Sequence, residues 1–434
     1  MILFKGVTLV LPEGIRNGDL LVENGKIKAI GPSLPEHAQT IIKDKGLTLM
    51  AGVIDPHVHF RDPGAPHKED LESGSMAAAA GGVTSFFDMP NTNPPAVTTA
   101  TIAQKKAIAA QKSLVNYNFY IGATQDNLED LLQTPNVPGI KLFVGSTTGN
   151  MLVDDPDILD RIFRTGSRLI AVHSEDEPTV LANKARYEGS TNPADHANIR
   201  SPEAALICTQ KLVALAEKYQ RRLHICHLTT EEEARYLAQH KPPFVTTELC
   251  LQHGFLHGPE IYEKYGCFAQ INPPLRDKRH GETLWQALVN GVIDCVATDH
   301  APHTIEEKQK PFGQAPSGMP GVETSLPLLL TQVAQHRCSL EQASRWLSAK
   351  PAELFKIHNK GELRVGFDAD LALVDLNATY KIEAKNLHSK CGWTAFEDWT
   401  VTGKPIATVV NGHFVYREGD FFKDQKGQEI IIKE

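Results

Sequence analysis

The chain has 434 residues, of which 41% are hydrophobic and 22% are charged, as in an ordinary soluble globular enzyme. This length is too great for one small core and is enough for a large barrel with a smaller domain beside it. The 44 basic and 52 acidic residues give a formal net charge of −8, which offers no reason to expect nucleic acid as a partner.

Three further features bear on the cellular compartment. The seven cysteines are scattered, odd in number and without a C-x-x-C pair, as expected of reduced thiols. The first residues lack a basic segment followed by a long apolar run, and no stretch approaches the roughly eighteen apolar residues of a membrane span. We therefore expect a cytoplasmic protein with no membrane partner.

The two ends of the chain share a β pattern. Short apolar runs alternate with turns in residues 1–51, and Asn24-Gly25 between apolar residues is a strong hairpin signal. The same pattern returns in residues 362–434, where Asn411-Gly412 marks another hairpin. We expect the two segments to pair into one small β-sandwich domain. The tail from 421 to 434 is polar, and we expect it to be loosely held.

Residues 52–361 alternate short apolar, β-branched runs with helical stretches, which is typical of βα units around a parallel sheet. The eight expected strands are 53–60, 84–88, 117–123, 139–144, 168–173, 223–228, 244–249 and 293–298. They predict an α/β fold, a TIM-type (β/α)8 barrel that forms the catalytic domain. An open doubly wound sheet is disfavoured because no G-x-G-x-x-G follows a strand. Residues 325–357 predict two helices broken at Lys350-Pro351.

The first barrel strand ends in a polar motif. His57 and His59 are two residues apart, so on a strand both side chains point to one face. Neutral imidazole is the commonest metal ligand, and this pair delivers two imidazoles to one point. Arg61 lies two residues after His59, so on a strand it points to the same face, and its guanidinium could hold a carboxylate through two hydrogen bonds. The alternative is a polar strand end with two solvated histidines.

Other strands bring metal-compatible groups to the same end of the barrel, where catalytic residues lie in this fold. Lys141 is inside an otherwise apolar strand, and three further strands end in His173, His227 and Asp299. This convergence favours a metal centre. Asp299 suits a general acid/base beside a bound metal, although it could instead cap a helix.

Lys141 has two interpretations. A buried, unpaired ammonium is costly, so the amine must be neutral, paired or modified. Reaction with CO2 would give a carbamate, an anionic ligand whose two oxygens can bridge two metal ions. The alternative is an ordinary ion pair with an aspartate or a glutamate.

Loops after the strands supply further candidates. Asn91 could donate an amide N–H to a substrate, and His303 could hydrogen-bond a carboxylate. Residues 304–321, rich in Lys, Gly and Pro, predict a mobile lid. Ordinary loop chemistry is the alternative for all three. We expect His224 and His300 to pack in the interior or to support the metal ligands. For four other histidines we expect a surface role at least as readily as a catalytic role: His67, His196, His253 and His257.

These motifs resemble those of the dihydroorotases, in the amidohydrolase superfamily. The resemblance rests on Asp55-Pro56-His57-Val58-His59-Phe60-Arg61-Asp62-Pro63-Gly64, Met89-Pro90-Asn91-Thr92-Asn93-Pro94, Ala297-Thr298-Asp299-His300-Ala301-Pro302-His303 and Gly321-Val322-Glu323-Thr324. It covers nearly the whole chain, including both terminal β segments. D-x-H-x-H alone marks the superfamily, whereas the arginine, the Pro-Asn-Thr-Asn-Pro loop and the Ala-Pro-His segment are more specific to dihydroorotases.

The resemblance implies two zinc ions, with six ligands in this chain: His57, His59, Lys141, His173, His227 and Asp299. His57, His59 and Asp299 would hold the more buried ion, and the other two histidines would hold the second. Carboxylated Lys141 and a hydroxide would bridge both ions. Some relatives use an aspartate after the fourth strand instead. The sequence Ile-Lys-Leu-Phe favours Lys141, with Asp154 or Asp155 as the remaining substitutes.

The resemblance also implies a reaction, the reversible interconversion of N-carbamoyl-L-aspartate and L-dihydroorotate in pyrimidine (UMP) biosynthesis. Five residues would contact the substrate: Arg61, Asn91, Asn272, His303 and Gly318. Arg61, Asn91 and His303 would hold its carboxylate, and Asn272 would contact the ring. The pairing of Gly318 is weaker, because Ser317-Gly318 stands where relatives have Phe-Gly. A homodimer is a further implication.

Two other interpretations compete with this one. Hydantoinases, dihydropyrimidinases and allantoinases share the metal ligands but bind substrates without the same carboxylate. A metal-free scaffold relative is the non-enzyme alternative, and it is disfavoured because all six candidate ligands are retained.

Overall fold

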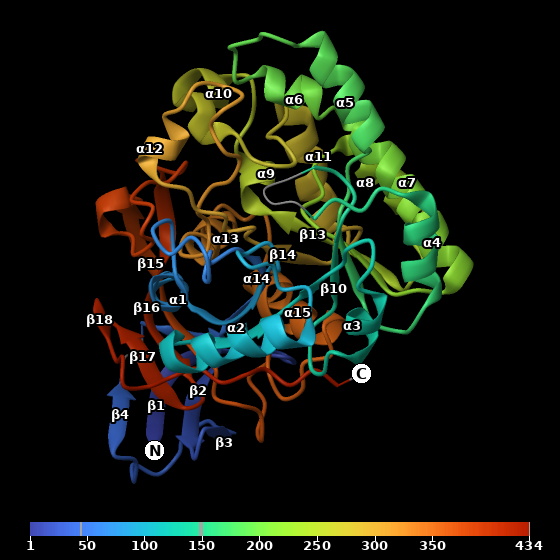
Figure 1. Ribbon diagram of the computed structural model, residues 1–434. Helices are drawn as coiled ribbons and strands as arrows, with labels where there is room; N and C mark the ends of the chain where they lie inside the picture. Colours follow the sequence, from blue (N-terminus) through green and yellow to red (C-terminus); the bar gives the residue numbers. More distant parts are fainter. Residues whose placement is uncertain (44–45, 147–150, 434) are drawn as a thin grey trace.

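The computed structural model describes residues 1–43, 46–146 and 151–433, and within them the strands of residues 53–297 form a closed barrel (Figure 1). Its strands are β6 (Val53–Val58), β7 (Val83–Asp88), β8 (Asn116–Phe119) continued by β9 (Ile121–Gly122), β10 (Ile140–Phe143), β11 (Ile170–His173), β12 (Leu223–Ile225), β13 (Val245–Cys250) and β14 (Cys295–Ala297). The barrel closes where the His59 amide donates to His300 O, 2.8 Å away. The predicted TIM-type barrel is confirmed.

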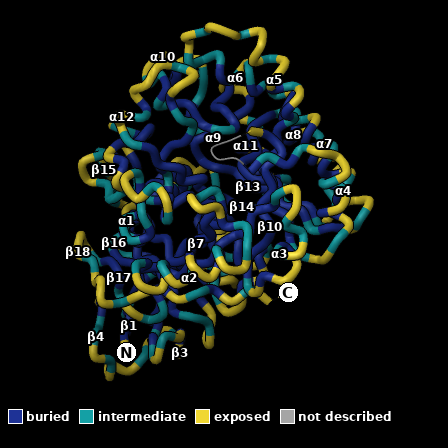
Figure 2. Tube along the Cα trace, in the orientation of Figure 1, coloured by how far each residue is buried: buried dark blue, intermediate teal, exposed yellow. Residues whose placement is uncertain are grey.

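Burial explains why these strands read as continuous apolar runs. Every residue of β6 and of β7 is buried, as expected where helices cover one face of a parallel sheet and side chains fill the barrel on the other. Figure 2 shows the same distribution, with buried strands inside and exposed segments in the outer loops.

Helices surround the barrel; those up to α11 connect its strands, and α12 to α15 follow the last strand. They are α1 (Leu71–Ala80), α2 (Thr99–Lys112), α3 (Leu128–Gln133), α4 (Pro156–Arg164), α5 (Glu177–Arg186), α6 (Asp195–Ile199), α7 (Pro202–Tyr219), α8 (Glu231–His240), α9 (Leu251–Phe255), α10 (Glu260–Tyr265), α11 (Lys278–Val289), α12 (Ile305–Lys308), α13 (Ser325–Ala334), α14 (Leu340–Ser344) and α15 (Lys350–Leu354). Short 3-10 turns occupy Gly266–Ala269 and Ala384–Asn386. Within the described ranges, no helix has both the length and the apolar composition that a membrane span needs.

The two ends of the chain meet in one nine-stranded sheet. Its strands are β1 (Ile2–Leu11), β2 (Gly14–Glu23), β3 (Lys26–Gly31), β4 (Thr40–Lys43), β5 (Thr48–Ala51), β15 (Leu371–Lys381), β16 (Thr400–Val410), β17 (His413–Arg417) and β18 (Asp420–Phe421). Strand β5 joins the halves, because it pairs with β1 on one side and with β15 on the other. Apolar side chains from both ends form one buried cluster, which confirms the expected pairing. The domain boundaries at 51/52 and 361/362 stay predictions.

Both predicted hairpins are present. Asn24-Gly25 joins β2 to β3, and Asn411-Gly412 joins β16 to β17. In each pair both residues have positive φ, between 50° and 79°. This is the conformation that the tight turns of β-hairpins require and that Asn-Gly adopts at little cost.

The expected break at Lys350-Pro351 is wrong. The helix ends earlier, after α13, and Ser339 caps α14. Helical backbone then continues through a π-helical turn, Arg345–Ala349, directly into α15. The wider turn immediately before Pro351 accommodates the proline ring, which would clash with a carbonyl in a regular α-helix.

The expectation of a loosely held tail is also wrong. Ile430 is 1% exposed and belongs to a buried apolar cluster. Its amide donates to Tyr117 O at 2.9 Å, and Asn118 Nδ2 donates to Ile430 O at 2.8 Å. The tail therefore runs along β8, where backbone pairing overrides its polar composition.

Candidate metal centre and active site

One pocket lies at the carboxyl ends of the barrel strands. It is lined by His57, His59, Arg61, Asn91, Lys141, Phe143, His173, His227, Asn272, Asp299, Ala301, Ser317 and Gly318. All six predicted metal ligands and four of the five predicted substrate contacts are in this set. The fifth, His303, lies directly behind Arg61, with its Nε2 atom 3.2 Å from the guanidinium.

The first cluster joins strands β6 and β14. The Nε2 atoms of His57 and His59 lie 3.2 and 3.0 Å from one oxygen of Asp299, and all three side chains are buried. Burial opposes charge on His57, but Asp299 and Glu248 outweigh it and raise the pKa of His57 to about 10. Burial likewise opposes charge on Asp299, yet His57 and His59 hold its pKa well below the usual range. Two imidazole nitrogens that meet a carboxylate are donors suited to a transition-metal ion.

The second cluster joins strands β11 and β12. His173 Nδ1 lies 3.1 Å from His227 Nε2, and the other ring nitrogen of His227 is buried without a partner in the described part of the chain. Burial is the largest influence on both groups and lowers both pKa values, so both imidazoles are neutral, the form that binds metals. His57, His227 and Asp299 each place a ligand atom within 4.8 Å of the others, so the two clusters adjoin.

The backbone is strained at three of these positions. Arg61, His227 and Asp299 have φ values of 61°, 35° and 45°, a region that residues other than glycine seldom adopt. Such conformations cluster at functional sites. Asp299 does not cap a helix, since α12 begins after its own cap, Thr304.

Lys141 is completely buried in β10 and points into this pocket. Its Nζ lies 3.1 Å from Cys226 Sγ, and among the described residues no carboxylate lies within 4.0 Å. The alternative prediction, that Lys141 forms an ordinary ion pair, is therefore not fulfilled in the described part of the chain. Asp155 is exposed, caps α4, and like Asp154 does not line the pocket. A buried amine without a counter-ion fits conversion to an anionic carbamate.

Two buried carboxylates that the sequence analysis missed support the histidines. Glu248, in β13, accepts from His57 Nδ1 at 2.5 Å and from the His227 amide at 3.1 Å. Glu175 lies 2.6 Å from His173 Nε2 and forms an ion pair with Arg200. Carboxylates of this kind orient ligand imidazoles. A charged residue in the apolar strand 245–250 was the available signal for Glu248.

The predicted carboxylate-binding residues lie beside the metal-compatible groups. Asn91 accepts from His59 Nδ1 at 2.7 Å through its carbonyl oxygen, which turns the amide nitrogen to the other side. Lys68 Nζ donates to His303 Nδ1 at 3.2 Å, and the carbonyl oxygen of Ser317 favours the tautomer that carries the proton on Nε2, although Arg61 Nη2 also lies 3.2 Å from that atom. That proton is available for an acceptor, and Ser317 O takes it at 3.1 Å. The sequence analysis also missed Lys68.

Two residues of the segment predicted as a lid, Ser317 and Gly318, line the pocket. Gly318 donates its amide to Gln270 O at 2.9 Å, and its φ of 147° with a carbonyl close behind leaves no room for a side chain. Lys308, also buried, donates to the same Gln270 O at 3.0 Å. These hydrogen bonds attach the segment to Gln270, and its mobility stays a prediction.

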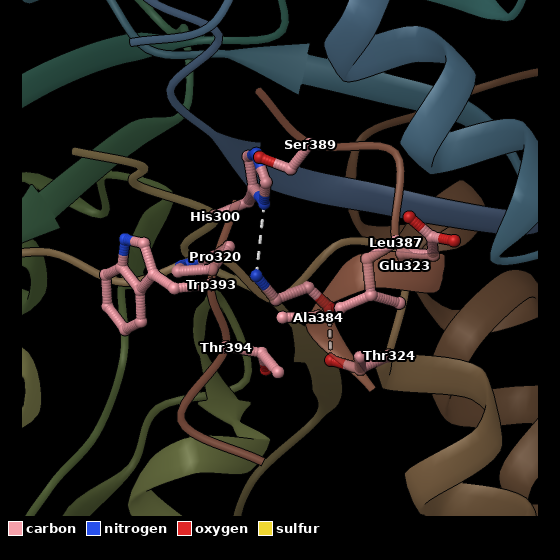
Figure 3. Close-up of a pocket in the computed structure, with 10 residues that line it drawn as sticks. His300, Pro320, Glu323, Thr324, Ala384, Leu387, Ser389, Trp393 and Thr394 are labelled. Carbon is pink, nitrogen blue, oxygen red and sulfur yellow. Dashed lines mark hydrogen bonds between the residues drawn. The ribbon is translucent and has the colours of Figure 1, made fainter. Parts of the chain in front are cut away.

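A separate small cavity lies between the loop that follows β14 and the carboxyl-terminal segment (Figure 3). Its wall includes His300, whose Nδ1 accepts from the Gly321 amide at 3.0 Å, and Trp393 from the carboxyl-terminal segment. Trp393 Nε1 donates to His303 O at 2.8 Å. His300 thus supports the loop after β14, as expected, and the terminal segment helps to position His303.

Two of the histidines for which surface roles were expected are buried on short helices, His196 on α6 and His253 on α9. His196 is buried, and its Nε2 lies 2.9 Å from Asn272 Oδ1 and 2.9 Å from Ile271 O. His253 is buried as well and donates to Pro273 O at 3.0 Å. Both hold the 271–273 loop in place, which positions Asn272 in the pocket.

Comparisons with known proteins agree with this geometry. The amidohydrolase family profile matches residues 48–415. A dihydroorotase of Methanosarcina acetivorans is 36% identical over 431 residues, covering 95% of this chain and 91% of that protein. An allantoinase of Streptomyces avermitilis is 33% identical over 435 residues, covering 97% and 96%. Among solved structures, L-hydantoinase (dihydropyrimidinase) from Arthrobacter aurescens gives a TM-score of 0.95 at 30% identity, covering 100% of this chain and 99% of that one.

Fold and pocket together define a barrel scaffold with buried groups able to hold a metal ion at the carboxyl ends of its strands. The family profile extends over most of that scaffold. The chain belongs to the amidohydrolase family.

Proposed function

We propose that this protein is a dihydroorotase that interconverts L-dihydroorotate and N-carbamoyl-L-aspartate. The observation that carries the proposal is the position of Arg61 and His303, 3.2 Å apart, at the edge of the pocket that holds the metal-compatible histidines. A guanidinium and an imidazole N–H side by side suit a substrate carboxylate next to the reacting amide. The identity to several dihydroorotases supports the same substrate.

The donor set fits two divalent ions such as zinc. His57, His59 and Asp299 would hold one ion, and His173 and His227 the other, with carboxylated Lys141 between them. The unpartnered His227 nitrogen and the buried Lys141 amine without a counter-ion are the observations that fit such a centre. When bound, the ions would polarise the ring amide and supply a nucleophile from water at neutral pH.

The side chains of the pocket have separate roles in substrate binding and proton transfer. Arg61 and His303 bind the carboxylate, and Asn91 donates its amide N–H beside them. Asp299 takes a proton at the carboxylate oxygen and delivers it to the leaving ring nitrogen during hydrolysis. The depressed pKa of Asp299 keeps its carboxylate ionised.

Dihydroorotate hydrolysis, followed through the loss of ring absorbance on protein of measured metal content, tests the proposal. Arg61→Met should lower kcat/KM at least about 30-fold, because removing one partner of a buried charged contact costs about 2–5 kcal/mol. The metal content should be unchanged. Arg364→Met, at an exposed position, is the matched control. Wild-type turnover by Arg61→Met would remove the reason for choosing this substrate.

A second candidate is a cyclic amidase of the allantoinase or hydantoinase type, which the Streptomyces avermitilis and Arthrobacter aurescens relatives favour. Two bound metal ions with turnover of allantoin or a hydantoin, and none of dihydroorotate, would select that candidate. Protein without metal and without hydrolysis of any cyclic amide would point to a scaffold.

A further inference from the structure

The side-chain amide of Asn272 can present either an N–H donor or a carbonyl acceptor to a substrate. Asn272 lies in the loop that follows the 3-10 turn Gly266–Ala269, and it lines the catalytic pocket. The end of the amide that faces the pocket decides which group a substrate has to offer at this position. The groups behind the amide determine which end that is.

His196 fixes the orientation of this amide. Its Nε2 atom lies 2.9 Å from Ile271 O and 2.9 Å from Asn272 Oδ1. A backbone carbonyl can only accept a hydrogen bond, so Nε2 carries a hydrogen and needs an acceptor from Asn272 as well. Burial, and then the charge of Arg200, lower the pKa of His196 to about 4, so the ring is neutral and Nε2 holds its one hydrogen. The amide oxygen therefore faces His196, and the amide nitrogen faces the other way.

His196 is held firmly enough to impose this orientation. It is buried on α6, and the Arg200 amide donates to His196 O at 3.1 Å. Arg200 also forms an ion pair with the buried Glu175 carboxylate, which ties the end of α6 to the segment after β11. On another side, the centre of the Phe312 ring lies 6.4 Å from that of the imidazole, with the two rings at 83°. The imidazole is thus fixed from several directions.

The protein leaves the amide nitrogen of Asn272 unused. Asn272 is half-buried, and its Nδ2 makes no hydrogen bond with any residue that the structure describes. Its two hydrogens are therefore left for a group in the pocket. A ring N–H would face another donor there, whereas a ring carbonyl oxygen would complete the hydrogen bond.

We propose that His196 is a positioning residue, which turns the Asn272 amide so that its N–H groups bind a ring carbonyl oxygen of the substrate. This inference rests on the proposed function, because the carbonyl belongs to the cyclic amide that is hydrolysed. His196 acts through Asn272 and does not touch the substrate itself. The hydrogen bond is made before the reaction as well as during it, so it contributes to KM and not to kcat.

Steady-state kinetics with dihydroorotate on protein of measured metal content test the proposal. Asn272→Asp keeps the shape and the acceptor for His196 but replaces the N–H groups with an oxygen, so KM should rise at least about tenfold. His196→Phe leaves the amide free to turn, so KM should rise about three- to tenfold. His196→Gln keeps an N–H donor and should restore most of this loss. The kcat and the metal content should stay nearly constant in all three variants.

Two comparisons separate positioning from a general effect on the fold. In an Asn272→Ala background, adding His196→Phe should change KM by less than about twofold, because the amide that His196 orients is absent. His280→Phe is the matched control. His280 is buried as well, accepts from the Glu231 amide at 2.9 Å and does not line the pocket, so KM should equal that of the wild type.

The outcomes distinguish this proposal from the proposed function. Wild-type KM in Asn272→Asp would overturn it, because the amide oxygen would then face the substrate. An equal effect of His196→Phe with and without Asn272→Ala would overturn it as well. Absence of dihydroorotate turnover by the wild type would refute the proposed function instead, and the same variants would then be measured with the hydantoin or allantoin that is hydrolysed. A metal-loaded wild type that hydrolyses none of these substrates would overturn both.

Discussion

Replacing Glu248 with glutamine tests how the metal-compatible histidines are held. Glu248 Oε1 accepts from His57 Nδ1 and from the His227 amide, and Oε2 lies 3.0 Å from His224 Nε2. Glutamine keeps the shape and the accepting oxygen at Oε1 but removes the negative charge. Its amide can donate to His224, whose other nitrogen faces the adaptable hydroxyl of Thr246 at 2.8 Å. The fold should therefore survive the change.

The expected magnitude follows from these contacts. A hydrogen bond to a charged acceptor contributes about 1.5–3 kcal/mol and a neutral one about 0.5–1.5 kcal/mol. The loss at His57 is the difference, roughly 1–1.5 kcal/mol, or about tenfold in metal affinity. That value lies at the lower end of the roughly 10–100-fold losses seen when groups behind metal ligands are removed.

Competition with a chromogenic chelator measures the metal affinity, and thermal unfolding of the metal-free protein shows whether the fold is intact. Glu233→Gln is the matched control, since Glu233 is buried and held by the Thr209 and Thr230 hydroxyls, both at 2.8 Å, away from the pocket. Metal affinity within twofold of wild type in a folded Glu248→Gln protein would refute the reasoning. An equal loss in the control would refute it too.

Three further changes have expected outcomes. Lys105→Met leaves the buried Asp88 carboxylate, 2.5 Å from the lysine amine, without its cation, and should lower the free energy of unfolding in urea by about 3–5 kcal/mol. Adding Asp88→Asn to the same chain should restore most of that stability. A loss below about 1 kcal/mol would contradict the importance of the buried pair. Lys68→Met should raise the KM for dihydroorotate about tenfold at nearly constant kcat. Nitrogen NMR should show a change in the tautomer of His303, to which Lys68 donates. An unchanged His303 spectrum would count against this role of Lys68. The hydrogen bond to Glu323 raises the pKa of His388 above its ordinary 6.5, so this contribution to stability is complete below pH 6.5 and is lost as the pH rises through the raised pKa. The melting temperature of His388→Gln should therefore not show this decrease with rising pH. If the melting temperature of the variant falls with pH as that of the wild type does, this role of His388 is contradicted.

The sequence predicted the barrel and placed its candidate ligands because both depend on local patterns. An apolar strand reads as a continuous run, and the residue that ends it lies at the catalytic face, so His173 and Asp299 could be found one strand at a time. Lys141 was found because a charge inside an apolar strand is unusual. The same signal was present for Glu248, but its meaning depends on His57, 191 residues away in the chain.

The failures have the same physical origin. Proline is a local signal for a helix break, but the π-helical turn before Pro351 accommodates it. The polar tail appeared unable to form a core, yet its backbone finds partners in Tyr117 and Asn118, about 310 residues earlier.

Strand β5 lacks one of its two partner strands during most of the synthesis of the chain. Its partner on one side, β15, begins at Leu371, which pairs with Ala51 about 320 residues earlier. At a translation rate of about 5–20 residues per second, the edge formed by Leu49, Met50 and Ala51 stays open for roughly 15–65 s. An open apolar edge is a template for pairing with other chains. The yield of folded protein should therefore depend on ribosome speed and chaperone supply during that interval, more than on the stability of the finished fold.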